Sequence, residues 1–311
     1  MLLHNYPNEF KDLVAIVADQ MHLPESAIER DYYIVYLLKN LVDSDYSEQC
    51  VFKGGTSLSK CYPGSIERFS EDIDLTFLGM ELSDKECDRM IKRIESVMTS
   101  GAETEKINAE RSNRSKSMFV WFNSKEDKIK LEIGSSVRPD PYSKKSVKTY
   151  IQEYLERNGY TDAVDQYKLE EIQLNVLDIT RTFVDKLMSI KRHAICGSLG
   201  DKVRHIYDVY RLYSLPEVQA FLKDKDELKR LMQITKETDS FYLSRRGISD
   251  EYDPRGTYDF PSWKHRLTDT IRSNYESLHK KGLLYTTEEQ HFGDALKVLE
   301  EIDAILGNIG E

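Results

Sequence analysis

The sequence has little tryptophan and cysteine, no long apolar run and no excess of positive charge. Only 2 of its 311 residues are Trp and 4 are Cys, and the cysteines lack the spacing of a zinc site. Four scattered thiols also argue against a disulfide framework. No apolar run reaches the roughly 18 residues that a membrane helix requires. The first residues lack the basic segment and apolar core of a secretory signal, so we expect a cytoplasmic protein without a membrane partner.

The net charge argues against one class of partner. A formal charge of −10 does not suit non-specific binding of nucleic acid by the whole surface. Three short basic segments, at 111–117, 143–148 and 186–193, still leave room for RNA held locally. Each segment, taken alone, is equally explained as a solvated loop or helix face.

The apolar patterns predict a mixed α/β part followed by a helical part. Apolar residues at three- and four-residue steps predict helices over 8–20 and 26–43. Short apolar or alternating runs predict strands within CVFKGG (50–55), DIDLTFL (72–78), SMFVWFNS (117–124), KIKLEIGSS (128–136) and IQLNVLD (172–178). The later sequence is helical apart from a polar interruption at 244–261. We therefore predict a domain over 1–165 with a small mixed sheet flanked by helices, and a mainly helical domain over 166–311.

Two carboxylates alternate within the predicted strand at 72–78. Residues two apart on a strand face the same side, so Asp72 and Asp74 direct both charges to one place. At a separation of about 5 Å and an effective dielectric constant of about 20 they would repel by roughly 3 kcal/mol. A bound Mg²⁺ ion would offset this repulsion, because it prefers hard oxygen ligands. The alternative is an exposed strand whose charges prevent aggregation.

A glycine-rich corner, GGTSLSK, precedes this strand. Gly54 and Gly55 would let the backbone approach a phosphate, and the amide groups of a helix start attract anions. The hydroxyls of Thr56 and Ser57 add donors, and Lys60 lies one turn further along. The spacing is not that of a P-loop, and a plain strand-to-helix turn would also require glycine. A phosphate-binding corner beside a metal-binding pair suits a nucleoside triphosphate.

A third carboxylate, Glu132, lies inside the apolar strand KIKLEIGSS. An unpaired carboxylate is costly among Leu131 and Ile133, so we expect Glu132 to have a partner. A neighbouring strand could bring it to Asp72 and Asp74 as a third metal ligand. The alternative is an ion pair with Lys128 or Lys130.

Taken together, these motifs resemble a known family. GGTSLSK followed by RFSEDIDL and a later acidic strand is similar to the polymerase-beta-type nucleotidyltransferase superfamily, and most of all to its AbiEii-like toxins, which include the MenT toxins. The resemblance extends over roughly residues 28–213, through IERDYYIVYLLKNL, VLDITRTFVDKLMSIKRH and RHIYDVYRL. It implies a nucleotidyltransferase-type α/β fold with a helical C-terminal domain. The segment between the glycine corner and Asp72 is slightly longer than in minimal members.

The resemblance also implies roles for particular residues. Gly55, Thr56 and Ser57 would hold the triphosphate, while Asp72 and Asp74, with Glu132 as third carboxylate, would bind Mg²⁺ at a two-metal site that could also accept Mn²⁺. The helical part would add three charged side chains to this machinery. They are Lys186 at the nucleotide phosphates, Asp208 as an acidic site residue and Arg204 one turn before it.

The implied function is transfer of NMP from an NTP to an acceptor hydroxyl, with release of pyrophosphate. The family role is that of the toxin of a type IV toxin–antitoxin or abortive-infection pair, with a cognate antitoxin and, for some members, the 3′ end of tRNA as acceptor. The basic segments at 111–117 and 186–193 would then hold RNA. Two alternatives stay open at this point: transfer to a small molecule or a protein hydroxyl, and a non-catalytic nucleotide-binding or partner module.

Overall fold

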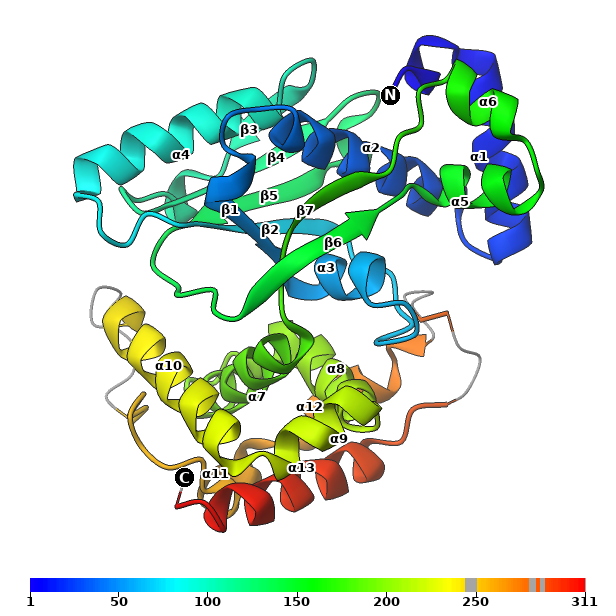
Figure 1. The fold of residues 1–311 in the computed structure, drawn as a ribbon. Helices are drawn as coiled ribbons and strands as arrows, with labels where there is room; N and C mark the ends of the chain where they lie inside the picture. Colours follow the sequence, from blue (N-terminus) through cyan, green and yellow to red (C-terminus); the bar gives the residue numbers. More distant parts are fainter. Residues whose placement is uncertain (244–250, 280–283, 286–288, 311) are drawn as a thin grey trace. The chain divides into compact units, whose positions relative to one another are not determined.

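A seven-stranded mixed sheet organises the first part of the chain (Figure 1). The computed structural model describes residues 1–243, 251–279, 284–285 and 289–310. The strand order is β3-β4-β5-β2-β1-β7-β6, with parallel pairing between β2 and β5 and between β1 and β7. The strands are β1 (Cys50–Lys53), β2 (Asp72–Phe77), β3 (Glu103–Lys106), β4 (Ser115–Trp121), β5 (Ile129–Gly134), β6 (Tyr142–Val147) and β7 (Ile172–Leu177).

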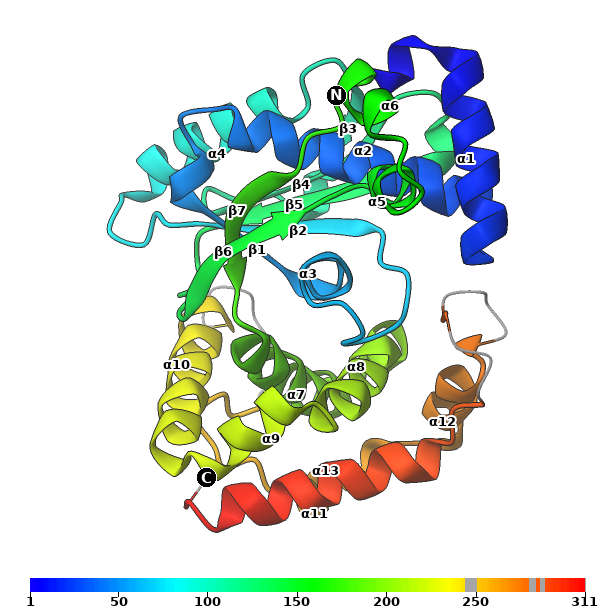
Figure 2. The ribbon, with the colours of Figure 1, turned by 45° about the vertical axis from the view of Figure 1, so that its right-hand side comes forward.

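Helices cover both faces of this sheet. Figures 1 and 2 show α2 and α4 on one face and the short α3 on the other. Ser83 and Glu86 form a capping box at the start of α4. The helices of this part are α1 (Pro7–Met21), α2 (Glu25–Val42), α3 (Gly54–Cys61), α4 (Asp84–Met98), α5 (Tyr150–Arg157) and α6 (Thr161–Gln166).

The described remainder of the chain is helical, as the sequence predicts. Asp178 caps α7 by accepting a hydrogen bond from the Thr180 amide at 2.9 Å. Residues 244–250, the first part of the predicted polar interruption, lie outside the described residues. The helices are α7 (Ile179–Ile195), α8 (Val203–Tyr213), α9 (Pro216–Lys223), α10 (Lys225–Leu243), α11 (Phe260–Trp263), α12 (Asp269–Glu276) and α13 (Phe292–Gly307).

The chain divides into two units at a different place from the sequence-based boundary. Unit 1 comprises Met1–Cys61 and Phe69–Leu177, and unit 2 comprises Tyr62–Arg68 and Asp178–Glu311. The boundary follows Leu177 rather than residue 165 because β7 pairs with β1 and β6 inside the sheet. The segment Tyr62–Arg68 groups with the helical unit.

The fold class is confirmed: a mixed sheet flanked by helices precedes a helical unit. None of the helices in the described ranges combines the length and the apolar character needed to cross a bilayer.

Candidate active site

The alternating aspartates lie near the middle of the sheet, on β2. Ile73 and Leu75 are buried, whereas Asp72 and Asp74 between them are half-buried on the opposite side of the strand. In the parallel pairing with β5, Asp74 lies opposite Glu132 and Asp72 lies opposite Lys130. The predicted strand and its alternation are therefore confirmed, and Glu132 lies in the strand position next to Asp74.

The glycine corner is built around the carboxylate of Asp74. Gly54 begins α3 with a φ of +84°, in the region that favours glycine. A Cβ atom at this position would lie 2.2 Å from Oδ2 of Asp74. The sequence thus needs glycine here for two reasons, the backbone conformation and the close approach of the carboxylate to the start of the helix.

The hydroxyls of the corner make local hydrogen bonds. Thr56 is buried, and its Oγ1 donates to the carbonyl oxygen of Asp72 at 2.5 Å, tying α3 to β2. The buried Ser57 donates to the carbonyl of Gly54 at 3.0 Å. These bonds fix the shape of the corner, so the groups best suited to phosphate are the backbone amides at the start of α3 rather than the two hydroxyls.

Lys60 lies at the other end of α3 and has a buried partner. Its Nζ is 2.6 Å from Oδ1 of Asp31 on α2, and both side chains are about 3% exposed. The Lys60 ammonium is therefore engaged by Asp31, and the phosphate-binding role expected for Lys60 has no support in this geometry.

The side chain of Glu132 forms an ion pair with its neighbour Lys130, as the alternative interpretation of this residue predicted. Oε1 of Glu132 lies 2.5 Å from Lys130 Nζ, which is also 2.8 Å from Oε2 of Glu110. Desolvation lowers the pKa of Lys130, but the hydrogen bonds to Glu110 and Glu132 outweigh it and raise the pKa above its ordinary value. Within the described ranges, no three Asp, Glu, His or Cys side chains gather as a metal-binding cluster.

The residues present nevertheless fit Mg²⁺ in one common mode. That ion is usually bound by one or two carboxylates, with water and substrate phosphates completing its octahedron. Asp72 and Asp74 supply two carboxylates on one side of β2, and Asp74 touches the start of α3, where phosphate would be expected. The pair therefore suits Mg²⁺, whereas Glu132 as a third metal ligand is not part of the observed geometry.

A second charged cluster is buried within unit 2. Asp208 on α8 is fully buried and accepts two hydrogen bonds from Arg68, at 2.6 and 2.7 Å. Lys186 on α7 reaches the same carboxylate at 2.7 Å. Burial alone would raise the pKa of Asp208, but Arg68 and Lys186 outweigh it and hold this pKa well below its usual range. Two cations therefore contact one buried carboxylate.

In this cluster Lys186 contacts Asp208, and Arg68 joins them. Sequence reasoning assigned no role to Arg68, although an arginine in the otherwise apolar and acidic RFSEDIDL motif was a usable signal. Arg204 is half-buried on α8 and makes no ion pair with a carboxylate in the described part of the chain. Burial lowers the pKa of the neighbouring His205 well below its ordinary value, with Lys186 contributing, so His205 is neutral there.

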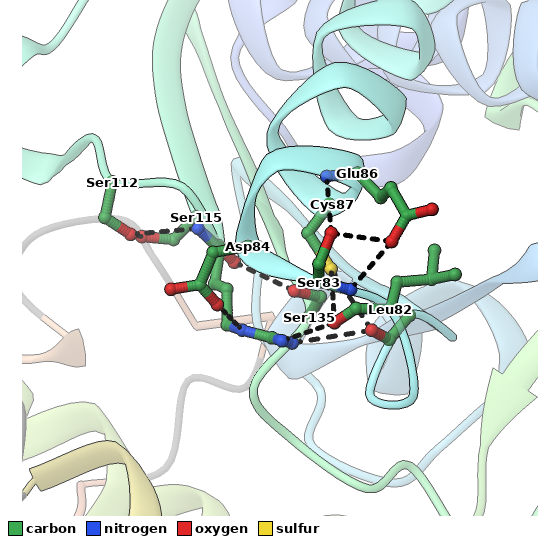
Figure 3. A network of polar contacts seen from close by, with 10 residues as sticks. Leu82, Ser83, Asp84, Glu86, Cys87, Ser112, Ser115 and Ser135 are labelled. Atoms are coloured by element: carbon green, nitrogen blue, oxygen red, sulfur yellow. Dashed lines mark hydrogen bonds and ion pairs between the residues drawn. The ribbon is translucent and has the colours of Figure 1, made fainter.

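The basic segment at 111–117 is neutralised by the acidic residues of α4. Arg111 forms a two-point ion pair with Glu95 at 2.7 and 2.8 Å, and Lys116 lies 2.7 Å from Asp88. Arg114 binds Asp84 at 2.6 Å and the carbonyl of Leu82 at 2.6 Å, within the network shown in Figure 3. These cations hold α4 to the sheet, so the expectation that they bind RNA has no support in the structure.

The other two basic segments are also largely paired. In 143–148, Lys144 binds Glu48 at 2.5 Å and Lys148 lies 2.8 Å from Glu156. In 186–193, Arg192 binds Asp239 at 2.7 Å, while Lys191 donates to the carbonyl of Thr257. In segment 186–193 the buried Lys191 thus has a backbone carbonyl as its described hydrogen-bond partner.

An alternating aspartate pair beside a glycine-rich helix start suits a nucleotidyltransferase, and the family match shows that class. The model of the family described as nucleotidyl transferase AbiEii toxin, type IV toxin–antitoxin system, matches residues 36–297. The chain belongs to this family of nucleotidyltransferase toxins, which implies a nucleotide substrate and a cognate antitoxin.

Two solved structures match this chain at low sequence identity. One is JHP933 from Helicobacter pylori, with 17% identity and a TM-score of 0.40, covering 83% of this chain and 96% of that chain. The other is MenT4, a nucleotidyltransferase toxin from Mycobacterium tuberculosis H37Rv, with 17% identity and a TM-score of 0.48, covering 95% of this chain and 98% of that chain. A comparison with curated proteins gave no match.

Proposed function

We propose that this toxin is a Mg²⁺-dependent enzyme that transfers NMP from an NTP to the 3′ end of tRNA. One observation carries the chemistry: Asp72 and Asp74 share one side of β2, and Asp74 rests against Gly54 at the start of α3. A triphosphate bound by the helix amides would therefore meet the two carboxylates that suit its metal ion. The tRNA acceptor is supported by the family resemblance alone.

The residues of unit 1 divide the work as follows. The amides at the start of α3 bind the phosphates, and Asp72 and Asp74 hold Mg²⁺, which supplies neutralisation of the phosphate charge. The acceptor hydroxyl attacks the α-phosphorus, a new P–O bond forms, and the bond to pyrophosphate breaks. Glu132, half-buried opposite Asp74, accepts the proton of the acceptor hydroxyl.

In unit 2 the relevant residues are the charged side chains around Asp208. Asp208 contacts two cations, Arg68 and Lys186, and cationic side chains of this kind suit an anionic group of the substrate. Asp208 orients both cations and is therefore a positioning residue. Lys186 is the side chain that the family resemblance assigns to the phosphates.

Loss of either strand aspartate should abolish transfer. With Asp72→Asn or Asp74→Asn the hard anionic ligands are lost, so we expect labelling to fall by on the order of 10³-fold or more, the range seen when a catalytic group is removed. The assay supplies each of the four α-³²P-labelled NTPs with Mg²⁺ to three separate acceptors: total tRNA, total cell protein and an aminoglycoside. Growth of cells expressing each variant provides a second readout.

The matched control for these variants is Asp162→Asn, a change at an exposed carboxylate on α6. It should label tRNA like the unchanged protein and remain toxic. Labelling of protein or aminoglycoside instead of tRNA would contradict tRNA as the acceptor, while nucleotidyl transfer itself would be supported. Full toxicity and full labelling by Asp72→Asn would overturn the enzymatic site.

Glu132→Gln should separate proton transfer from nucleotide binding. The amide keeps the shape of the side chain but cannot take up a proton, so we expect kcat to fall by about 10²–10⁴-fold with the KM for NTP nearly unchanged. Glu105→Gln, on β3, is a suitable control because Glu105 also pairs with a lysine, Lys125, at 2.6 Å. Equal kcat values for the two variants would remove Glu132 from the mechanism.

A further inference from the structure

Two adjacent residues of α2, Arg30 and Asp31, each hold one of the segments that form the candidate site. They belong to IERDYYIVYLLKNL, a motif that the catalytic assignments leave without a role. Asp31 is buried, and its Oδ1 lies 2.6 Å from Nζ of Lys60, near the end of α3. Its Oδ2 accepts a hydrogen bond from the backbone amide of Tyr150 at 2.7 Å, at the first residue of α5.

Tyr150 also packs against this ion pair. The ammonium of Lys60 also lies 3.9 Å from the centre of the Tyr150 ring, so Tyr150 contacts both charges. Burial raises the pKa of Asp31 and Lys60 opposes that rise, so the charged carboxylate depends on its lysine. The end of α3 is thus fixed to α2 and α5 together.

Arg30 reaches the other segment. Its Nη1 lies 2.7 Å from Oε1 of Glu71, the residue immediately before β2. Its Nη2 lies 3.5 Å from Oδ1 of Asp127, shortly before β5. The Arg30 side chain is only 13% exposed, so the contact with Glu71 is partly shielded from solvent. Arg30 therefore holds the start of the strand that carries Asp72 and Asp74.

A small movement at either of these ion pairs would displace the groups of the candidate site. An eight-residue helix is about 12 Å long, so a tilt of about 5° at the Lys60 end moves the Gly54 end by about 1 Å. A displacement of about 1 Å can cost roughly 10²-fold in rate, because reacting groups must be aligned. The Asp74 carboxylate already lies too close to Gly54 for even a Cβ atom to fit, so the corner has little tolerance for such a tilt.

We propose that Arg30 and Asp31 are positioning residues for nucleotidyl transfer. By tying the end of α3 and the start of β2 to one helix, they fix the helix amides against the strand carboxylates. This inference rests on the proposed function for the placement of triphosphate and metal at that corner. It also gives a reason for the contact of Lys60, a lysine of the GGTSLSK motif, with Asp31.

The competing explanation is that these ion pairs only stabilise the fold. Unit 1 contains a matched pair that tests this, because Arg111 and Glu95 are 12% and 6% exposed and join α4 to the segment before β4. Loss of that pair should weaken unit 1 without moving α3. The comparison is therefore between Asp31→Asn and Glu95→Gln, with Lys60→Met and Arg30→Met as second variants that remove the opposite partner.

The experiment measures three quantities on the full chain: the melting temperature, the Kd of each Mg·NTP by calorimetry, and hydrogen exchange of the amides of residues 54–61. For Asp31→Asn and Lys60→Met we expect a lower melting temperature, a Kd raised at least about tenfold and faster exchange at 54–61. Arg30→Met should raise the Kd in the same direction. Glu95→Gln should lower the melting temperature only.

The outcomes are distinguishable. If Asp31→Asn matches Glu95→Gln in Kd and exchange at a similar loss of melting temperature, the residues are structural and the inference is overturned. If the unchanged chain binds none of the four NTPs, the proposed function fails, and the inference fails with it. Lys60→Arg rebuilds the ion pair with Asp31. A Kd for Mg·NTP closer to that of the unchanged chain than to that of Lys60→Met would support the positioning role.

Discussion

Gly54→Ala is expected to remove nucleotidyl transfer while leaving the protein folded. The new Cβ would lie 2.2 Å from Oδ2 of Asp74, so either the carboxylate or the start of α3 must move. Because the reacting groups must be aligned, this displacement of the carboxylate or the helix start should reduce the rate of transfer by roughly 10²-fold or more. The backbone strain of alanine at φ +84° adds a stability loss of about 1–2 kcal/mol. Transfer of label to acceptor and thermal unfolding measure the two effects separately.

Gly159→Ala is the matched control for this prediction. Gly159 has a φ of +77°, close to that of Gly54, but nothing lies within 4 Å of its added Cβ. It should therefore show a similar loss of stability with transfer unchanged. Equal activity of the two alanine variants would mean that the approach of Asp74 to Gly54 has no part in the chemistry.

Asp208→Asn is expected to have the largest effect on stability. It leaves the buried Arg68 and Lys186 without their shared counter-charge, and breaking a buried ion pair from one side costs about 3–5 kcal/mol. Urea unfolding measures this loss. The comparison is Asp294→Asn, which breaks an exposed pair with Lys297 in the same unit and should leave the unfolding midpoint unchanged.

The Asp208 carboxylate should also make the stability of the folded chain depend on pH. The pKa of Asp208 is lowered in the folded chain, so its contribution to stability is complete above about pH 4, the ordinary pKa of aspartate, and is lost as the pH falls through the lowered value. Stability of the unchanged protein should therefore decrease below pH 4 more steeply than that of Asp208→Asn. If the stabilities of the unchanged protein and of Asp208→Asn fell in parallel below pH 4, Asp208 would not be the charged partner of Arg68 and Lys186.

The sequence predicted those parts of the fold whose signals are local. The alternation of Asp72, Ile73, Asp74 and Leu75 was sufficient to predict β2. The two missed strands, β3 and β6, lie at the two edges of the sheet. All four residues of β3 are exposed, and β6 buries only its last residue, so neither carries the apolar alternation by which a strand is recognised.

The partners of the charged residues could not be predicted in the same way. Lys60 and Asp31 are 29 residues apart, and Arg68 and Asp208 are 140 apart, so no local pattern connects them. Glu132 was expected beside the aspartates, and the strand register places it there, but its side chain pairs with Lys130. Which of two nearby partners a carboxylate binds depends on side-chain geometry that the pattern of a strand does not contain.

The short segment Tyr62–Arg68 has a consequence for how this chain can be divided. It lies in sequence between α3 and β2 of unit 1, yet it groups with unit 2 and supplies the arginine that binds Asp208. A fragment starting at Asp178 would keep Asp208 and Lys186 and lose Arg68. No single cut in the gene therefore releases a complete helical unit, and exchange of such units between relatives by recombination would require two joints rather than one.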